Sequence, residues 1–273
     1  MDINGIGRRL LVEYRLDEAG RVLSSNVLDK TPDVSYEELA RIVENEKKNF
    51  DMDAAIASLE TVDSVIRLPW QMAYPVVGVA ADGSKLTWNY DDVPMGMIVS
   101  GDAEARRTAV DTVSKTLAAD VKFQRVAPGD EHGMLSDAMD VMMSRYEKME
   151  AATRNNWKDM PGYGGPGAET IILAIDFDRL PFSPEVDSML GSVARLGRAA
   201  DVHLLLSMST AQGMPGEMKS NVNMRLLLGK TDEAESARVL DDSMGARLPD
   251  GESEYGVLEV WSDVQPVRLA KTM

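Results

Sequence analysis

Short apolar runs alternate with amphipathic segments along most of the chain after residue 74. The six runs are PVVGVA (75–80), MGMIVS (95–100), TIILAID (170–176), VHLLLSM (202–208), MRLLLG (224–229) and YGVLEV (255–260). The amphipathic segments between them cover residues 105–117, 135–149, 186–196 and 232–240. Strands that alternate with helices in this way are typical of a parallel sheet covered by helices. The sequence therefore predicts an α/β domain over residues 71–273, with a mainly parallel sheet flanked by helices.

Residues 1–70 do not follow this alternation and are predicted to form a small α/β N-terminal extension. Two alternating runs on either side of the turn DEAG, within residues 8–29, predict a β-hairpin. A first helix is expected from Ser35, because Glu38 follows three residues later and gives the spacing of a capping box. A second helix is expected over residues 53–66, after which the chain leads into the larger domain. No motif in the extension points to a particular chemistry.

The composition excludes several kinds of site. The chain of 273 residues has no cysteine, which excludes disulfides and thiolate metal sites, and its two histidines, His132 and His203, leave little for zinc or for histidine-based catalysis. His203 stands between Val202 and Leu204, which indicates a buried or strand-end residue. No stretch reaches the roughly 20 apolar residues that span a bilayer. We therefore expect a cytoplasmic protein without a membrane segment.

The segment GDAEARRT (101–108) lies where a phosphate-binding loop is expected, between the strand MGMIVS and an amphipathic helix. Such a loop has the pattern G-x-x-x-x-G-K-[ST]. Its glycines turn backbone amides inward, its lysine neutralises phosphate charge and its hydroxyl holds magnesium. On this spacing Gly101 and Thr108 are retained. Arg106 stands in place of the second glycine, and Arg107 stands in place of the lysine.

These replacements disfavour tight nucleotide binding in the usual geometry. The guanidinium of Arg107 is bulkier than an ammonium and directs its hydrogen bonds differently, so it does not simply replace lysine. Asp102 and Glu104 would also place carboxylates close to a triphosphate. We therefore expect no cofactor. ATP and magnesium are expected only if the altered loop still binds them.

Asp176 ends the run TIILAID, at the position from which an acidic residue holds the magnesium shell in such folds. The next residue, Phe177, stands where a catalytic glutamate usually polarises the attacking water, and its ring can do no acid or base work. Asp178 is a candidate substitute, but a helix cap or a surface carboxylate is the favoured interpretation.

Several segments within residues 74–269 resemble the FtsK/SpoIIIE-type translocase ATPases. The lead-in to the loop (74–101) is similar to the family's PV-x-G strand, turn and W-x-[LY] strand, and MLSDAMDVMMSRYEKMEAATRNN is similar to its helix with the pattern E-M-x-x-R-Y-x-x-M. The most specific segments are SVARLGRAADVHLLLSMSTAQG and MKSNVNMRLLLGKTDEAESARVLDDSMGARLPDGESEYGVLEV. Their ordered residues include Arg195, Gly197, Arg198, His203, Lys219, Asn221, Arg225, Asp232, Ser236, Asp241 and Gly245.

The resemblance implies a RecA-like P-loop NTPase fold, in a subunit that assembles into hexameric rings and moves DNA or, in secretion relatives, a protein. It places the family's polar sensing glutamine at Ser209. It also places Arg195 and Arg198 where the family supplies positive charge at subunit boundaries, although both could instead pair with nearby acids. Lys219 and Arg225 could contact a polymer in a pore, or cap a strand and a turn.

Two sets of candidate residues follow. The expected nucleotide contacts are Gly101, Arg106, Arg107, Thr108, Asp176 and Ser209. Thr108 and Asp176 would hold Mg²⁺ if a nucleotide binds, and Asp176 and Asp178 would be catalytic only in an active enzyme.

Three functional positions have changed together: the lysine, the glutamate after Asp176 and the sensing glutamine. Loss of one positioned charge in phosphoryl transfer typically costs on the order of 10³-fold in rate. The sequence therefore predicts a pseudo-ATPase that serves as an assembly, regulatory or structural partner in a DNA- or protein-translocation system. One alternative is an active, divergent DNA translocase, with Arg107 replacing lysine and Asp178 replacing glutamate. The other is a non-enzymatic structural component of a phage or mobile element of actinobacterial type.

The expected partners are further copies of the chain or a competent FtsK/SpoIIIE-like ATPase. DNA is a disfavoured partner, because the formal net charge is −16 and affinity for the phosphate backbone comes mostly from lysine and arginine. A small local basic contact with DNA stays open.

Overall fold

The computed structural model describes residues 12–16, 22–27, 50–126, 129–163, 169–179, 183–214, 216–261 and 263–273. The chain divides into two compact units, Met1–Asp51 and Met52–Met273, and this division lies nearer the N-terminus than the boundary predicted at residue 70. In the first unit β1 (Val12–Leu16) pairs antiparallel with β2 (Val22–Val27), as expected for the predicted hairpin. The helix expected from Ser35 lies outside the described residues.

The larger unit begins with α3 (Met52–Glu60), which is shorter than the helix predicted over residues 53–66. The β-branched residues of β3 (Val65–Ile66) pair instead with β13 (Lys271–Thr272), in parallel. Arg268 in β12 (Asp263–Arg268) donates from Nη1 to the carbonyl oxygens of Glu60 and Val62, each at 3.1 Å. These contacts join α3 and β3, which the sequence assigns to the extension, to the larger unit.

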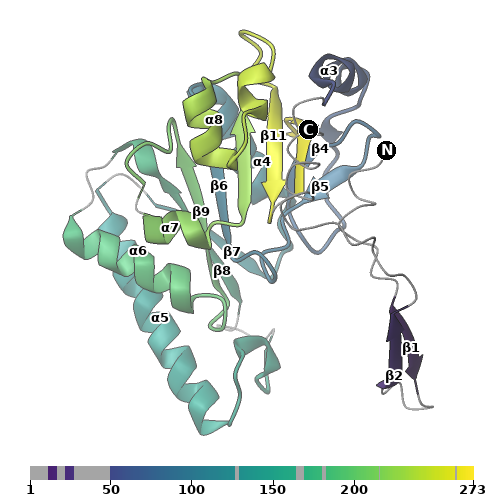
Figure 1. Ribbon diagram of the computed structural model, residues 1–273. Coiled ribbons are helices and arrows are strands. Elements are labelled where there is room, and N and C mark those ends of the chain that lie inside the picture. The colour runs from purple at the N-terminus through teal and green to yellow at the C-terminus, as the bar shows by residue number, and fades with distance from the viewer. Residues whose placement is uncertain are drawn as a thin grey trace. The chain divides into compact units, whose positions relative to one another are not determined.

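A nine-stranded sheet forms the centre of the larger unit (Figure 1). In spatial order its strands are β5 (Lys85–Thr87), β4 (Val76–Val79), β12, β11 (Tyr255–Val260), β10 (Met224–Leu228), β6 (Met95–Val99), β9 (Val202–Met208), β8 (Thr170–Asp176) and β7 (Val121–Arg125). All six apolar runs of the sequence form strands of this sheet.

The sheet is mixed, which corrects the prediction of a mainly parallel one. From β10 through β6, β9 and β8 to β7 the neighbours are parallel, whereas from β10 through β11, β12 and β4 to β5 they are antiparallel. A short connection accounts for one antiparallel pair, because only residues 261 and 262 separate β11 from β12 and so short a link joins antiparallel strands. Trp261 lies in this turn with a left-handed φ of 60° and is 56% exposed.

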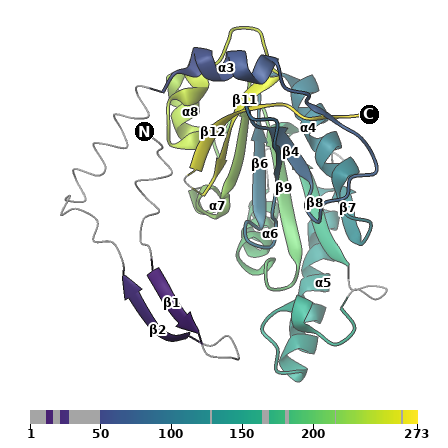
Figure 2. The same cartoon turned by 90° about the vertical axis from the view of Figure 1, so that its right-hand side faces the viewer.

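Helices cover both faces of the sheet. They are α4 (Ala103–Thr116), α5 (Glu131–Ala151), α6 (Pro184–Leu196), α7 (Gly216–Asn221) and α8 (Glu233–Leu240), with the 3₁₀ helices η1 (Trp157–Asp159), η2 (Phe177–Arg179) and η3 (Met244–Arg247). Figures 1 and 2 show α4 against one face and α7 and α8 against the other. The helix α6 packs on β9, and α5 packs on α6. None of the helices in the described ranges is long and apolar enough to cross a membrane.

The helices pack apolar side chains into the core. Val113 of α4 and Leu190 of α6 are both 0% exposed, and burial of such a side chain stabilises the fold by about 1.5–3 kcal/mol. The core between α4 and the sheet includes Val113, Ile98 and Leu205. This packing fixes the start of α4 beside the carboxyl ends of β6, β8 and β9.

The register of the parallel strands brings three carboxyl ends together. Val99 at the end of β6 lies opposite Met208 of β9, and Asp176 at the end of β8 lies opposite Ser207. The loops that follow β6, β8 and β9 therefore meet at one edge of the sheet, where α4 begins. The predicted nucleotide residues end or follow three neighbouring strands, with β9, before Ser209, between β6 and β8.

Candidate functional site

The first turn of α4 is capped by the chain's own carboxylate. Asp102 accepts hydrogen bonds from the backbone N–H groups of Glu104, at 2.8 Å, and Ala105, at 3.4 Å. Backbone amides at a helix N-terminus are the groups that bind a phosphate in such loops. Here two of them already hold an anion that belongs to the protein. Gly101, just before the cap, is exposed.

Arg106 lies near the start of α4, and not in a loop as the sequence predicts, and it turns inward, unlike the exposed Glu104 and Arg107. It is 8% exposed, and its Nη1 donates to the carbonyl oxygen of Ser100 at the end of β6. Its Nη2 lies 2.5 Å from Oδ2 of Asp178. Arg107 behaves differently, because its side chain is 62% exposed and pairs with Glu104 within the same helix.

Asp178 connects the loops after β8 and β9. Its Oδ1 accepts from the backbone N–H of Ser209, and its own N–H donates to Oδ1 of Asp176 at 3.2 Å. With Oδ2 on Arg106, both carboxylate oxygens have donors. Asp178 is exposed, as a surface carboxylate would be, but it is engaged by Arg106 and by the backbone of Ser209.

Two cavities lie beside the start of α4, and the predicted magnesium ligands line different ones. A cavity of about 350 Å³ is lined by residues that include Arg106, Arg107, Arg125, Glu131 and Asp176. A wider hollow of about 620 Å³ is lined by residues that include Asp102, Glu104, Thr108, Glu252 and Lys271. Of these two cavities, Asp176 lines the first and Thr108 the second, whereas two ligands of one ion would line the same one.

The predicted interface arginines lie at the other edge of the sheet. Arg195 is in the last turn of α6, and Arg198 is in the turn that precedes β9, whereas the loop at Gly101 follows the parallel strand β6. Both arginines are exposed, and Nε of Arg198 donates to the backbone oxygen of Asp91 at 3.0 Å.

Lys219 and Arg225 make internal ion pairs. Both contact Asp241, each at 2.9 Å, and Arg225 also lies 3.0 Å from Glu259. Desolvation by itself would raise the pKa of Asp241, but the hydrogen bonds from Lys219 and Arg225 prevail and lower it. These contacts join α7, β10, β11 and the end of α8.

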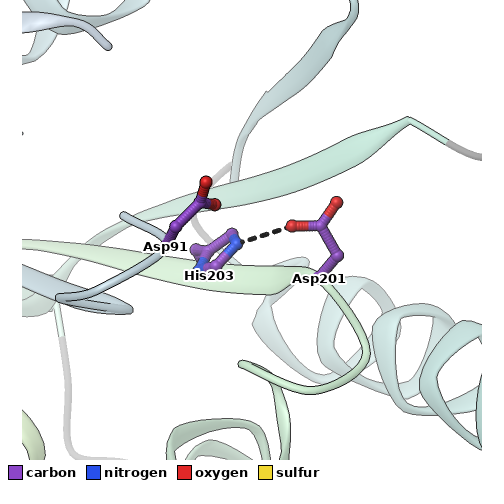
Figure 3. Close-up of side chains that lie close together, drawn as sticks. All are labelled: Asp91, Asp201 and His203. Atoms are coloured by element: carbon purple, nitrogen blue, oxygen red, sulfur yellow. Dashed lines mark hydrogen bonds and ion pairs between the residues drawn. The ribbon is translucent and has the colours of Figure 1, made fainter. Parts of the chain in front are cut away.

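A second polar cluster lies at the edge of the sheet where the parallel strands begin, which we call the amino edge (Figure 3). Asp201 and His203 stand at the start of β9 and are 0% and 1% exposed, and Asp91 lies in the turn before β6. The oxygen and nitrogen atoms of the three residues that could bind a metal lie within 4.8 Å of one another. This group has the donor types of a metal site and was not anticipated from the sequence.

The cluster already contains a cation. The ammonium of Lys158 pairs with Oδ1 of Asp91 and lies 3.6 Å from Oδ1 of Asp201. Asp201 also accepts from Oγ1 of Thr170, at 2.7 Å, and from the hydroxyl of Tyr163, at 3.0 Å. A metal ion would have to displace Lys158, so the arrangement fits a structural ion-pair network better than a metal centre.

Burial and hydrogen bonding act in opposite directions on the charges of this cluster. Burial raises the pKa of Asp201, but hydrogen bonds from His203 and Thr170 outweigh it and leave that pKa below its usual value of 3.8. For Lys158, burial lowers the pKa, and the hydrogen bond to Asp91 with the charge of Asp201 raises it above 10.5 overall. Burial and a hydrogen bond to Asp91 raise the pKa of Tyr74 to about 12. The cluster therefore favours the charged forms of the Asp201 carboxylate and the Lys158 ammonium.

Comparison with solved structures shows which proteins share this fold. No family model and no curated protein matches the chain. The solved structure of the pCW3 conjugation coupling protein TcpA, a monomer with ATPγS, matches 74% of this chain at 14% identity and a TM-score of 0.63. The cytoplasmic domain of EccC, a type VII secretion ATPase of Thermomonospora curvata, matches 82% at 19% identity and a TM-score of 0.61.

A third structure, ATPases 2 and 3 of EssC from Geobacillus thermodenitrificans, matches 74% of this chain at 12% identity and a TM-score of 0.58. The three matches cover 66%, 32% and 45% of those proteins, so this chain spans less than two thirds of each of these three structures. Over 74% or more of its length, the chain has the P-loop ATPase fold of a conjugation coupling protein and a type VII secretion ATPase, in agreement with its sequence resemblance to FtsK/SpoIIIE-type translocase ATPases.

Proposed function

We propose that this protein is a catalytically degenerate relative of the translocation ATPases, which keeps their fold and serves as an assembly, regulatory or structural partner in a DNA- or protein-translocation system. One observation carries the proposal: the ion pair between Arg106 and Asp178. It joins the residue in place of the second loop glycine to the carboxylate that could have replaced the catalytic glutamate.

The ion pair removes both residues from nucleotide chemistry. A glycine at position 106 would let the backbone approach a phosphate, whereas the guanidinium there is 8% exposed and is directed at protein acceptors. A general base must reach the proton that it abstracts, directly or through one water. Both oxygens of Asp178 are engaged by Arg106 and by the backbone of Ser209.

The other residues of the site also fit a magnesium-bound triphosphate poorly. Asp102 places a carboxylate on the amides that would receive a phosphate, where it would repel one. Thr108 and Asp176 line different cavities. We therefore assign no step of ATP hydrolysis to this chain and propose that Gly101, Arg107 and Ser209 have no nucleotide to bind.

The setting is inferred from the proteins that share the fold, which serve conjugation and type VII secretion. We propose that the partner is either further copies of this chain or a competent ATPase of the same fold. The net charge of −16 supports a protein partner over DNA, because an extended DNA contact needs a surplus of basic residues.

The test is a joint measurement of binding and turnover. Thermal shift with ATP and Mg²⁺, and steady-state ATP hydrolysis with and without DNA, are compared for the wild type and Asp176→Asn. We expect no shift and no turnover in either protein, and an oligomeric state in solution that does not change with nucleotide. Hydrolysis by the wild type that disappears in Asp176→Asn would overturn the proposal in favour of an active, divergent translocase.

A further inference from the structure

Arg106 ties together three strand ends that are distant in sequence. Its Nη1 reaches the carbonyl oxygen of Ser100 after β6, and its Nη2 reaches Asp178 after β8, which is 72 positions away. Asp178 in turn accepts from the N–H of Ser209 after β9. We call this set, the side chains of Arg106 and Asp178 with the backbones of Ser100 and Ser209, the Arg106 latch.

We propose that the Arg106 latch does for this protein what a bound nucleotide does at a functioning loop: it holds the ends of β6, β8 and β9 in one arrangement, permanently and without a ligand. This inference rests on the proposed function. In ATPases of this kind the phosphates and their magnesium contact several loops, so the order of those loops depends on the ligand. A cation that is covalently part of the chain is always present, so the edge of the sheet stays in one state.

The guanidinium side of the latch is largely buried. The side chain of Arg106 is 10% exposed and that of Asp178 is 24% exposed, so water competes little for the guanidinium, although Asp178 and Ser209 stand at the surface. Hydrogen bonds in which both partners are charged are roughly twice as strong as neutral ones. By contrast, the adjacent pair between Arg107 and Glu104 is 62% and 69% exposed and is expected to contribute little.

A second carboxylate, that of Glu235, binds the residues that follow Ser209 in the loop after β9. Glu235 of α8 is 7% exposed and accepts from the N–H of Ala211 and, at 2.8 Å, from Oγ1 of Thr210. Within three residues, the N–H of Ser209 is therefore held by the latch and the N–H of Ala211 by α8. The two amides provide a reporter and an internal control.

The experiment measures residue-resolved amide hydrogen exchange by NMR on the full chain. Arg106→Met keeps an unbranched apolar side chain and removes the guanidinium. We expect exchange at Ser209 to become at least about tenfold faster, which corresponds to about 1.4 kcal/mol, while exchange at Ala211 changes little. The matched control Arg107→Met, which alters only the exposed neighbour, should leave both amides unchanged. Adding ATP and Mg²⁺ to the wild type should also leave Ser209 unchanged.

The outcomes separate this inference from the proposed function. An unchanged Ser209 in Arg106→Met, or equal acceleration of Ser209 and Ala211, would overturn the latch and leave the absence of ATP binding intact. ATP that binds the wild type and slows exchange at Ser209 would overturn the proposed function. If Arg106→Met does not fold, Asp178→Asn keeps an acceptor for Ser209 but removes the charge, and it should still accelerate Ser209 selectively.

Discussion

Nε2 of His203 lies 3.0 Å from Oδ1 of Asp201, and each side chain is 1% exposed. The pair begins β9 at the amino edge of the sheet, opposite the loop that follows β6. Asp201 is the acceptor on which Thr170, Tyr163 and His203 converge. The stability of this edge therefore depends on one buried negative charge.

Replacing that charge should be costly. Asp201→Asn leaves the ammonium of Lys158 with one carboxylate fewer and exchanges an acceptor oxygen for a donor amide. Removal of one partner from a buried ion pair typically destabilises by about 3–5 kcal/mol, and we expect a loss near the lower value at pH 7. Urea unfolding measures it, and Asp159→Asn on the exposed surface is the control that should change little.

The same variant should change the response to acid. The pKa of Asp201 is lower in the folded protein than its usual 3.8, so its stabilisation is complete above that value and disappears as the pH falls below it. The difference in unfolding free energy between wild type and Asp201→Asn should shrink below about pH 4. A difference that persists unchanged to the lowest pH at which the protein folds would contradict the depressed pKa.

A methyl group added at each of two glycines should change the stability of the protein by very different amounts. At Gly197, after α6, an added Cβ would overlap the backbone oxygen of Val202 and would lie 2.6 Å from that of Val193. At Gly101 it would meet nothing within 4 Å. We expect Gly197→Ala to cost at least about 1–3 kcal/mol, and Gly101→Ala to stay within about 0.5 kcal/mol. Urea titrations of the two variants, run side by side, measure the two free energies of unfolding. Equal losses would mean that the residues around Gly101 are packed more tightly than described.

Truncation of Glu235 should loosen the loop after β9. Glu235→Ala leaves the buried N–H of Ala211 without its acceptor, and an unsatisfied buried group costs about 1–3 kcal/mol. Glu235→Gln keeps an acceptor oxygen and should lose less. Thermal unfolding of both variants tests the order, and equal losses would show that the charge pair with Arg238, and not the hydrogen bond to Ala211, matters most.

The altered loop should regain affinity when its pattern is rebuilt. Combining Asp102→Ser, Arg106→Gly and Arg107→Lys removes the anion from the helix N-terminus, opens the backbone and restores the ammonium, while serine still caps α4. We expect calorimetry to detect Mg-ATP binding by this variant. Turnover should stay absent, because Phe177 still replaces the catalytic glutamate.

Asp102→Ser alone is the matched control for the rebuilt loop and should not bind. Failure of the triple variant to bind, with its fold intact, would mean that residues beyond 102–107 prevent nucleotide binding.

The sequence predicts the buried parts of the fold well, because apolar runs such as TIILAID have few alternatives to a central strand. It misses β7 and β12, and the reason lies in their composition. VKFQR in β7 forms an edge strand with half-exposed side chains, and DVQPVR in β12 contains a proline. Such strands form because an adjacent strand supplies their hydrogen bonds, and the local sequence pattern does not show which strand will be adjacent.

At the candidate site the sequence predicts Arg106 in a loop, whereas it lies near the start of α4, and the sequence does not predict the direction of its side chain. Whether a guanidinium turns to solvent or to Asp178 depends on the register of β6, β9 and β8, which brings the two residues together. The amino-edge cluster has a weak signal: Asp201 and His203 are two positions apart at the start of a strand and so share a face. Lys158 gives no comparable signal, since it lies in a separate 3₁₀ turn.

Trp261, in the turn between β11 and β12, gives the protein a natural fluorescent reporter. At 56% exposure its indole should emit at longer wavelength than that of Trp88, which is 1% exposed in the core. Excitation at the red edge of the absorption band favours the solvated indole. A molecule that covers this hairpin would shift the emission to shorter wavelength, with no label attached.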